Sequence, residues 1–232
     1  MDNKKKITLL VSSLRGGGAE RVCVNVANIL ISTGWEVNLV VLNLNNLTFF
    51  SQLSKKVNLV KLNISRVRFS GLAILKYVFK NKPEIFLVFN YELSVVLILL
   101  RSLFKLKFKV ISRNINTISE KLEQLKNENF WKKNVIKKLI NKYYFNADHI
   151  INQCHGMYTD LTKVSPKNYN NSSVIYNPIS YEILDYLSSN DLNKIEKKNY
   201  LLCVGRLEKQ KAFHYAIKGF AGIAEEFPNL RL

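Results

Sequence analysis

The feature that most restricts the fold of this chain is a series of short apolar segments without strict alternation of polar and apolar residues. The series includes residues 7–11 (ITLLV), 35–42 (WEVNLVVL), 84–89 (EIFLVF) and 108–114 (FKVISRN). Such runs are typical of strands in a parallel sheet whose two faces are both covered. Segments with helical spacing of apolar residues separate them. This alternation predicts an open α/β sheet.

The same alternation continues through the first 180 residues. Further strands are predicted near residues 57–63, at 147–154 and at 172–180, and helices over residues 22–30, 70–81, 91–105 and 156–164, with the Lys-rich region 117–142 mainly helical. In the helix over residues 70–81, the apolar face is expected to consist of Leu72, Leu75, Val78 and Phe79.

The composition changes after residue 180. Residues 1–180 are expected to form one domain, and the polar stretch 181–198 a linker, with or without a short helix. Residues 199–232 then begin a second βα pattern, with a strand over 200–204 and a helix over 212–227. About 35 residues cannot bury a core of their own. We therefore expect the last helix to pack on the first domain, to pair with another chain or to belong to a longer protein.

The charge of the chain is strongly positive. Its 35 Lys and Arg against 17 Asp and Glu give a formal net charge of +18. Such an excess favours nucleic acid, a membrane surface or phosphorylated substrates as partners, although a generally Lys-rich composition would also explain it. No nucleic-acid recognition motif is found, so nucleic acid is not expected as the partner.

Cysteine usage and hydropathy predict a cytoplasmic protein. Cys23, Cys154 and Cys203 are odd in number and form no C-x-x-C pair, which indicates free, buried thiols in a reducing compartment. The longest apolar zone, residues 85–104, is interrupted by charged and polar residues and is too polar for a spanning helix.

Three consecutive glycines, Gly16, Gly17 and Gly18, lie between the first strand and the first helix. A loop at a helix N-terminus presents backbone N–H groups to negative charge. The loop matches neither G-x-G-x-x-G nor a Walker loop, and a tight strand–helix turn is an equally open interpretation. Glu20 is expected to favour the helix dipole rather than to act in catalysis, while Arg21 either contacts a phosphate or is solvated.

No metal site is predicted. His149, Cys154 and His155 are near one another in sequence, but their spacing does not match known ligand patterns. No Ser/His/Asp or Cys/His set stands out.

Several ordered segments carry a family resemblance. They are SLRGGGAERVCVNVANILISTGWEVNLVVL, ADHIINQCHGMYTDL, VIYNPIS and LLCVGRLEKQKAFHYAIKGFAGI. Together they resemble the retaining GT-B glycosyltransferases, of the family 4-like type that builds bacterial lipopolysaccharide, O-antigen and capsule. The resemblance implies two Rossmann-like domains, an acceptor-side domain first and a nucleotide-sugar donor domain second, with no metal or other cofactor.

Site residues follow from this resemblance. Gly16, Gly17 and Gly18 correspond to the loop beside the donor phosphates, and Arg206 and Lys211 to the basic pair that neutralises the diphosphate. The alternatives are a turn residue at Arg206 and a solvated lysine at Lys211.

The chain also departs from the family in three ways. Arg113 and Asn114 occupy the neighbourhood of a catalytic histidine, and Ala212 replaces the glycine that usually follows the lysine. If position 212 needs a positive φ, alanine is strained there. The family's E-x7-E pattern has no counterpart before Leu232, and Glu225 and Glu226 do not substitute for it.

The resemblance therefore implies transfer of a sugar from a nucleotide sugar to a lipid-linked or polysaccharide acceptor. Because the donor domain is incomplete, we expect residues 1–232 alone neither to bind a UDP-sugar tightly nor to turn it over. The alternatives are a sugar-nucleotide epimerase of the same fold and a non-enzymatic basic protein that binds nucleic acid or membranes.

The basic and apolar residues suggest where a membrane could bind. Segments 79–82, 101–109 and 131–144 combine Lys or Arg with apolar residues. They predict a peripheral contact with the anionic inner face of the cytoplasmic membrane. A solvated charged helix is the alternative for 131–144.

Overall fold

The computed structural model describes residues 5–43, 48–125, 130–168, 170–179, 181–189, 199–205, 207 and 211–232. The chain divides into two units, Met1–Ser180 and Tyr181–Leu232.

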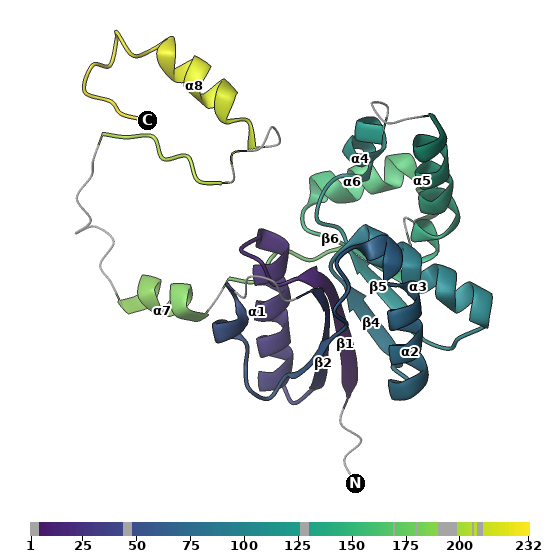
Figure 1. The fold of residues 1–232 in the computed structure, drawn as a ribbon. Coiled ribbons are helices and arrows are strands. Elements are labelled where there is room, and N and C mark those ends of the chain that lie inside the picture. Colours follow the sequence, from purple (N-terminus) through teal and green to yellow (C-terminus); the bar gives the residue numbers. More distant parts are fainter. Residues whose placement is uncertain are drawn as a thin grey trace. The chain divides into compact units, whose positions relative to one another are not determined.

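Seven strands form the sheet of the first unit (Figure 1). They are β1 (Lys6–Ser13), β2 (Glu36–Asn43), β3 (Asn58–Lys61), β4 (Ile85–Val88), β5 (Lys109–Arg113), β6 (His149–Asn152) and β7 (Ser172–Val174). Their order is β3-β2-β1-β4-β5-β6-β7, and every neighbouring pair is parallel. The predicted Rossmann-like open parallel sheet is therefore confirmed. The strand order reverses between β1 and β4, which is where sheets of this kind bind ligands.

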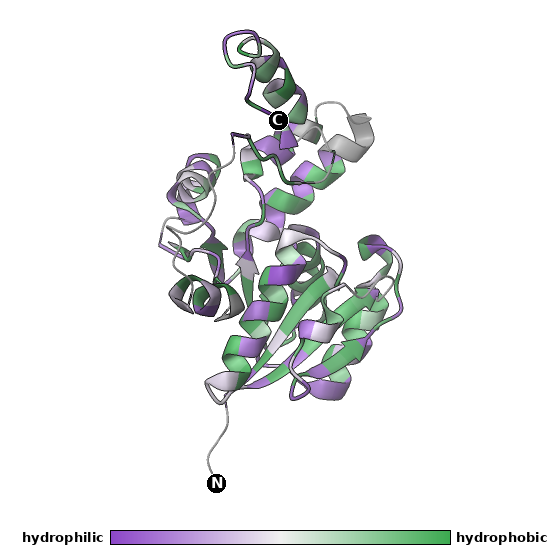
Figure 2. Cartoon of the chain, turned by 90° about the vertical axis from the view of Figure 1, so that its left-hand side faces the viewer, coloured by the Kyte–Doolittle hydropathy of each residue, from purple (hydrophilic) through white to green (hydrophobic). Residues whose placement is uncertain are grey.

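Helices cover both faces of this sheet. They are α1 (Gly18–Ser32), α2 (Gly71–Asn81), α3 (Tyr91–Phe104), α4 (Ile118–Gln124), α5 (Phe130–Lys142) and α6 (His155–Val164). One hydrophobic core contains the buried residues of α1, and a second contains those of α2 to α6. The strands between the two cores are mostly apolar along their length (Figure 2). This explains why their sequences show runs rather than alternation.

The predicted apolar face of α2 is correct for Val78 and Leu75, which belong to the core or pack against it, and wrong for Leu72 and Phe79. Leu72 is 83% exposed and Phe79 is 56% exposed, whereas Ile74, Tyr77 and Val78 are buried. The hydroxyl groups of Tyr77 and Thr8 lie 3.4 Å apart, and the Tyr77 ring meets Phe86 edge to face. Tyr77 was left out of the expected face, yet its aromatic body fills the space over β1 and β4. The helix is consequently rotated relative to the prediction.

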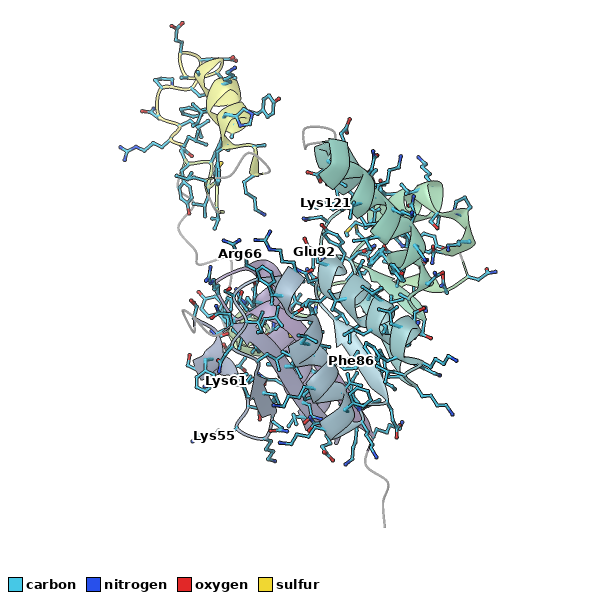
Figure 3. All side chains as sticks on the ribbon, turned by 45° about the vertical axis from the view of Figure 1, so that its right-hand side comes forward. Lys55, Lys61, Arg66, Phe86, Glu92 and Lys121 are labelled. Carbon is cyan, nitrogen blue, oxygen red and sulfur yellow. The ribbon has the colours of Figure 1, made fainter. Side chains whose placement is uncertain are left out.

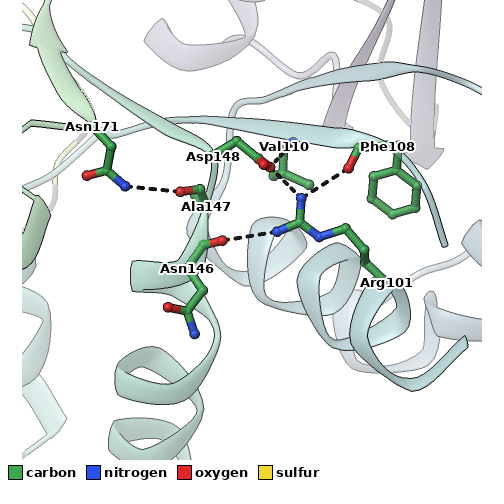
Figure 4. A network of polar contacts seen from close by, with 7 residues as sticks. All are labelled: Arg101, Phe108, Val110, Asn146, Ala147, Asp148 and Asn171. Carbon is green, nitrogen blue, oxygen red and sulfur yellow. Dashed lines mark hydrogen bonds and ion pairs between the residues drawn. The ribbon is translucent and has the colours of Figure 1, made fainter. Parts of the chain in front are cut away.

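A polar network fixes the amino-terminal ends of β5 and β6 (Figure 4). Arg101, on α3, donates hydrogen bonds to the backbone carbonyls of Phe108 (3.0 Å) and Asn146 (3.1 Å) and pairs with the carboxylate of Asp148. The same carboxylate accepts the Val110 N–H at 2.7 Å. One arginine and one carboxylate thereby join a helix to two strands.

The second unit contains two helices in its described residues, α7 (Tyr181–Ser189) and α8 (Phe213–Ala221). The short helix allowed for in the linker is present as α7. The strand predicted over residues 200–204 is reduced to one parallel bridge between Tyr200 and Arg231. The helix predicted over 212–227 ends at Ala221, with Gly222 as its C-cap. None of the helices in the described ranges is long and apolar enough to cross a membrane.

We predict that Asp148→Ala destabilises the first unit. The change leaves the Val110 N–H and part of the Arg101 guanidinium without an acceptor, which should cost about 1–3 kcal/mol of unfolding free energy. Urea denaturation followed by circular dichroism measures it. Glu36→Ala is the control because Glu36 forms an exposed pair with Lys6 at 3.0 Å and should cost less than about 1 kcal/mol. Equal losses in the two variants would contradict the role given to Asp148.

Candidate functional site

The candidate site lies at the carboxyl-terminal edge of the sheet, around the strand-order reversal between β1 and β4. Three of the segments that reach this edge form the candidate site. They are the glycine loop after β1, the start of α3 after β4, and residues 113–118 after β5. Parallel strands bring the segments that follow them to one edge.

The glycine loop leads directly into α1. Gly17 is the N-cap of this helix and its φ of −100° is ordinary extended backbone. Gly34 is the one described glycine with a positive φ, so none of Gly16, Gly17 and Gly18 needs to be glycine for its backbone conformation. Gly18 has open space, because no atom lies within 4 Å of where its Cβ would stand, as is also true of Gly34, Gly71 and Gly219.

Glu20 lies over this loop. A Cβ on Gly17 would come within 2.2 Å of the Glu20 carboxylate, so a side chain there would displace the carboxylate. Glu20 also accepts a hydrogen bond from the Ser13 hydroxyl at 3.3 Å. A carboxylate in the first turn of a helix interacts favourably with the positive end of the helix dipole. This geometry agrees with the role expected for Glu20.

Arg113, at the end of β5, is almost completely buried. Its residue is 5% exposed, and its guanidinium lies 5.7 Å from the ring centre of Phe89. Nη2 donates a hydrogen bond to the side-chain carbonyl of Asn177, while Nη1 is buried without a hydrogen-bond partner among the described residues. Burial lowers the pKa of Arg113, and the nearby Cys23 partly opposes this.

Asn114 is tied into a buried polar network. Its side-chain carbonyl accepts the Tyr144 hydroxyl, and its amide donates to Asn152 at 2.7 Å. The backbone carbonyl of Asn114 accepts from Gln153 at 2.7 Å. Burial raises the pKa of Tyr144, which keeps its hydroxyl protonated as a donor. This network fixes the turn after β5.

A small pocket of about 140 Å³ opens beside this turn. It is lined by Tyr91, Glu92, Lys121 and residues 114–118; Glu92 and Lys121 are labelled in Figure 3. The Lys121 ammonium lies 5.5 Å from the ring centre of Tyr91. Burial, followed by the neighbouring Glu92, raises the pKa of Tyr91.

Sequence reasoning missed the pocket residues Tyr91, Glu92 and Lys121. A signal for the first two was available, because Asn90 follows β4 and caps α3. Its side chain accepts the N–H groups of Glu92 at 2.8 Å and Leu93 at 3.3 Å. An N-cap after a parallel strand marks the carboxyl edge.

The remaining predicted residues lie in the second unit. Arg206 is outside the described residues. Lys211 is described, and its side chain packs beside Gly205, with Cγ and Cδ 3.4 Å from where a Cβ would stand. Ala212 has a φ of +57°, so the strain anticipated at this position is present.

The cysteine and histidine predictions fare differently. Cys23 is buried, but the predicted burial of Cys154 and Cys203 is wrong, because both are exposed. Cys154 lies beyond the end of β6, where it is the exposed N-cap of α6. His149 pairs with Ser173 at 2.8 Å. Within the described ranges, no group of three or more His, Cys, Asp or Glu is placed to hold a metal ion.

Comparisons with known proteins identify the fold. No protein-family model matches the chain, and no curated protein matches it. HepE from Anabaena, solved with UDP and glucose, has a TM-score of 0.62 and 16% identity over 94% of this chain and 58% of its own. Sucrose-phosphate synthase from Thermosynechococcus elongatus has a TM-score of 0.67 and 14% identity, and the match covers 95% of this chain and 60% of the synthase chain. The apo form of WaaB, a lipopolysaccharide outer core galactosyltransferase, has a TM-score of 0.52 and 17% identity, and the match covers 75% of this chain and 46% of the WaaB chain.

These likenesses show a fold shared with GT-B glycosyltransferases. The expectation of that fold is therefore confirmed. The chain spans about 58% of the length of HepE.

We predict that Ala212→Gly stabilises the start of α8. An L-residue in the left-handed region costs about 1–2 kcal/mol that glycine avoids. Amide hydrogen exchange should show increased protection of the α8 amides by about fivefold for 1 kcal/mol. Ala216→Gly, inside the same helix, is the control and should lower protection. Unchanged or decreased protection in Ala212→Gly would show that the backbone at this position is not strained.

Proposed function

We propose that this chain forms the acceptor-side part of a glycosyltransferase that uses a nucleoside-diphosphate sugar. The observation that carries the proposal is the open glycine loop at the N-terminus of α1, at the reversal of strand order. The same fold occurs in HepE, whose solved structure holds UDP and glucose. Retention of the anomeric configuration and family 4-like membership are part of the proposal.

The loop suits the phosphates of such a donor. The first N–H groups of α1 have no partner within the helix, and the N-cap Gly17 supplies no side-chain bond. The free volume beside Gly18 allows a phosphate or sugar to approach the backbone. Negative charge develops on the leaving diphosphate, and fixed N–H dipoles stabilise it. We assign Arg206 and Lys211 the cationic part of this task, which requires no metal.

The pocket beside β5 is the proposed place for the acceptor. Glu92 and Lys121 supply an acceptor and a donor of hydrogen bonds for sugar hydroxyls. Asn114 positions this wall through its buried bonds to Tyr144 and Asn152. We therefore assign Asn114 a positioning role within the proposed catalytic neighbourhood of Arg113 and Asn114.

A ligand titration tests the donor part of the proposal. We predict weak, saturable binding of UDP-glucose to the chain, with amide shifts in nuclear magnetic resonance concentrated at residues 16–19. Gly18→Leu fills the open space and should abolish these shifts without lowering the melting temperature. Gly71→Leu is the matched control because Gly71 also begins a helix with open space around it. Shifts elsewhere, or equal binding by Gly18→Leu, would contradict the assignment.

Product analysis separates transfer from epimerisation. The chain is incubated with a nucleotide sugar labelled in its sugar, with and without a lipid-linked glycan. We expect no turnover by residues 1–232 alone, so a product of either kind would also overturn that expectation. Label on the glycan supports transfer. Label in an epimerised nucleotide sugar, formed without the glycan, would instead establish the epimerase.

We also propose that the acceptor is lipid-linked, as in lipopolysaccharide, O-antigen or capsule synthesis, and that the protein binds the anionic membrane that holds it. The supporting surface is an exposed cluster of Phe79, Leu103 and Phe104, which are 56%, 65% and 49% exposed. The two phenylalanine rings meet edge to face at 6.5 Å. We call these three residues and the flanking Lys80, Lys82, Lys105 and Lys107 the lysine-ringed patch.

This surface is formed by two of the three segments that the sequence suggested, 79–82 and 101–109. In the third segment, 131–144, Tyr144 is fully buried, so the end of that segment is not a surface. The lysine-ringed patch lies where α2 and α3 end, at the edge of the sheet opposite the candidate site. A strand of 8 residues spans about 26 Å. The patch thus suits an acceptor whose growing sugar end stands away from the bilayer.

We predict that the patch controls vesicle binding. Sedimentation should show binding to anionic vesicles at low salt and its weakening at high salt. Replacing Phe79, Leu103 and Phe104 by serine should weaken it by at least about tenfold, because apolar burial and cation attraction act together. Leu72→Ser is the control, because Leu72 is exposed at the other end of α2. Unchanged binding of the triple variant, or no binding by the wild type, would refute this surface.

A further inference from the structure

We propose that Arg113 binds an oxyanion, a phosphate or pyrophosphate group of the ligand, through its unpartnered guanidinium edge. The phosphate would belong either to the nucleotide sugar or to a phosphorylated lipid acceptor. The choice of these two sources of the phosphate rests on the proposed function, whereas the inference that an anion binds here rests on the burial and the hydrogen bonds of Arg113.

The hydrogen bonds of Arg113 leave one edge of the guanidinium unused. Arginine carries five N–H donors in a planar fork. Nη2 is bonded to Asn177, and Nη1 has no protein partner among the described residues although its residue is 95% buried. Buried donors without a partner are rare in native proteins and call for an explanation.

The charge of Arg113 is also uncompensated. In the described part of the chain, the ion pairs are Lys6–Glu36 and Arg101–Asp148, and neither includes Arg113. Its bonded neighbour Asn177 is neutral, and its electrostatic neighbour Cys23 is a buried thiol whose pKa is raised by burial. A buried cation is strongly destabilised without a paired anion.

Arg101 provides an internal comparison. It is also a largely buried arginine, and it is bonded to two backbone carbonyls and a carboxylate. Its role is to join α3 to β5 and β6. Among the described residues, the hydrogen-bond acceptor of Arg113 is Asn177, so a purely structural role leaves its free edge unexplained.

Arg113 lies on the same side of the sheet as the start of α1, which belongs to the proposed ligand site. Phe89 and Cys23, its ring and thiol neighbours, both belong to the core on the α1 side of the sheet. Cys23 also interacts electrostatically with Glu20, in the first turn of α1. Arg113 therefore lies on the same side of the sheet as the N-terminal turns of α1. Free N–H groups and a guanidinium fork both favour a group with several anionic oxygens.

Three substitutions test the proposal. Arg113→Met removes the cation, and Asn177→Asp places a carboxylate at the atom position that already accepts Nη2. Asn177→Asp preserves shape, so it keeps the test decisive if Arg113→Met fails to fold. Arg66→Met is the control, because Arg66 is exposed and its loss lowers the net charge equally.

The measurement is binding of inorganic pyrophosphate at constant ionic strength, followed by amide shifts and by thermal stabilisation. We expect Arg113→Met and Asn177→Asp each to weaken binding by at least about tenfold, the effect of losing a charge-assisted bond. Asn177→Asp should also raise the melting temperature of the free protein. Arg66→Met should bind as the wild type does. Equal binding by wild type, Arg113→Met and Asn177→Asp would overturn the proposal, as would an equal loss in Arg66→Met.

UDP and geranyl pyrophosphate, used as further probes, distinguish the two sources. Tighter Arg113-dependent binding of UDP than of inorganic pyrophosphate assigns the phosphate to the donor, and tighter binding of geranyl pyrophosphate assigns it to a lipid acceptor. If neither exceeds inorganic pyrophosphate, the anion site stands and both proposed sources of its phosphate fail. If UDP binds tightly but without regard to Arg113, the proposed function stands and this inference fails.

Discussion

The parallel pairing of β1 with both β2 and β4 is the constraint on which the first unit depends. β1 lies inside the sheet between β2 and β4, and its register with β2 runs from Lys6 opposite Glu36 to Ser13 opposite Asn43. Because every strand points the same way, each chain segment that leaves a strand does so at one edge. The glycine loop, the N-cap of α3 and the turn after β5 are thereby neighbours, although they are far apart in sequence. The candidate site is a consequence of topology before any side chain is considered.

Burial of polar groups at this edge gives the site its shape. Asn114 and Asn152 are 3% and 0% exposed, and each bonds the other and a further group. Satisfied networks of this kind hold a single arrangement because every alternative leaves a buried donor or acceptor unpaired. Arg113 stands beside this network and does not share its completeness. Asn114 therefore stabilises the carboxyl edge of the sheet, whereas the Nη1 group of the adjacent Arg113 has no hydrogen-bond partner among the described residues.

Sequence reasoning predicted the strands of the first unit because their burial on both faces produces apolar runs. It did not place Tyr77 on the buried face of α2. The Tyr77 ring packs in the core, and its hydroxyl forms a hydrogen bond with Thr8. The strand over residues 200–204 is only a bridge, since a strand requires a neighbour, and Arg231 alone supplies one. The free edge of Arg113 was beyond prediction, because its bonded partner Asn177 is 64 residues away.

The direction of the helices makes the two edges of the sheet favour ions of opposite charge. A βα unit in a parallel sheet places each helix N-terminus at the carboxyl edge of the strands and each C-terminus at the other edge. Helix N-termini favour anions and C-termini favour cations. The chain follows this rule at both ends, because the glycine loop opens α1, whereas Lys82 and Lys105 close α2 and α3 as left-handed C-caps. Lysines that first favour the helix ends also create the positive rim of the lysine-ringed patch. A single backbone arrangement thus makes one edge favourable for anions and places lysines at the other.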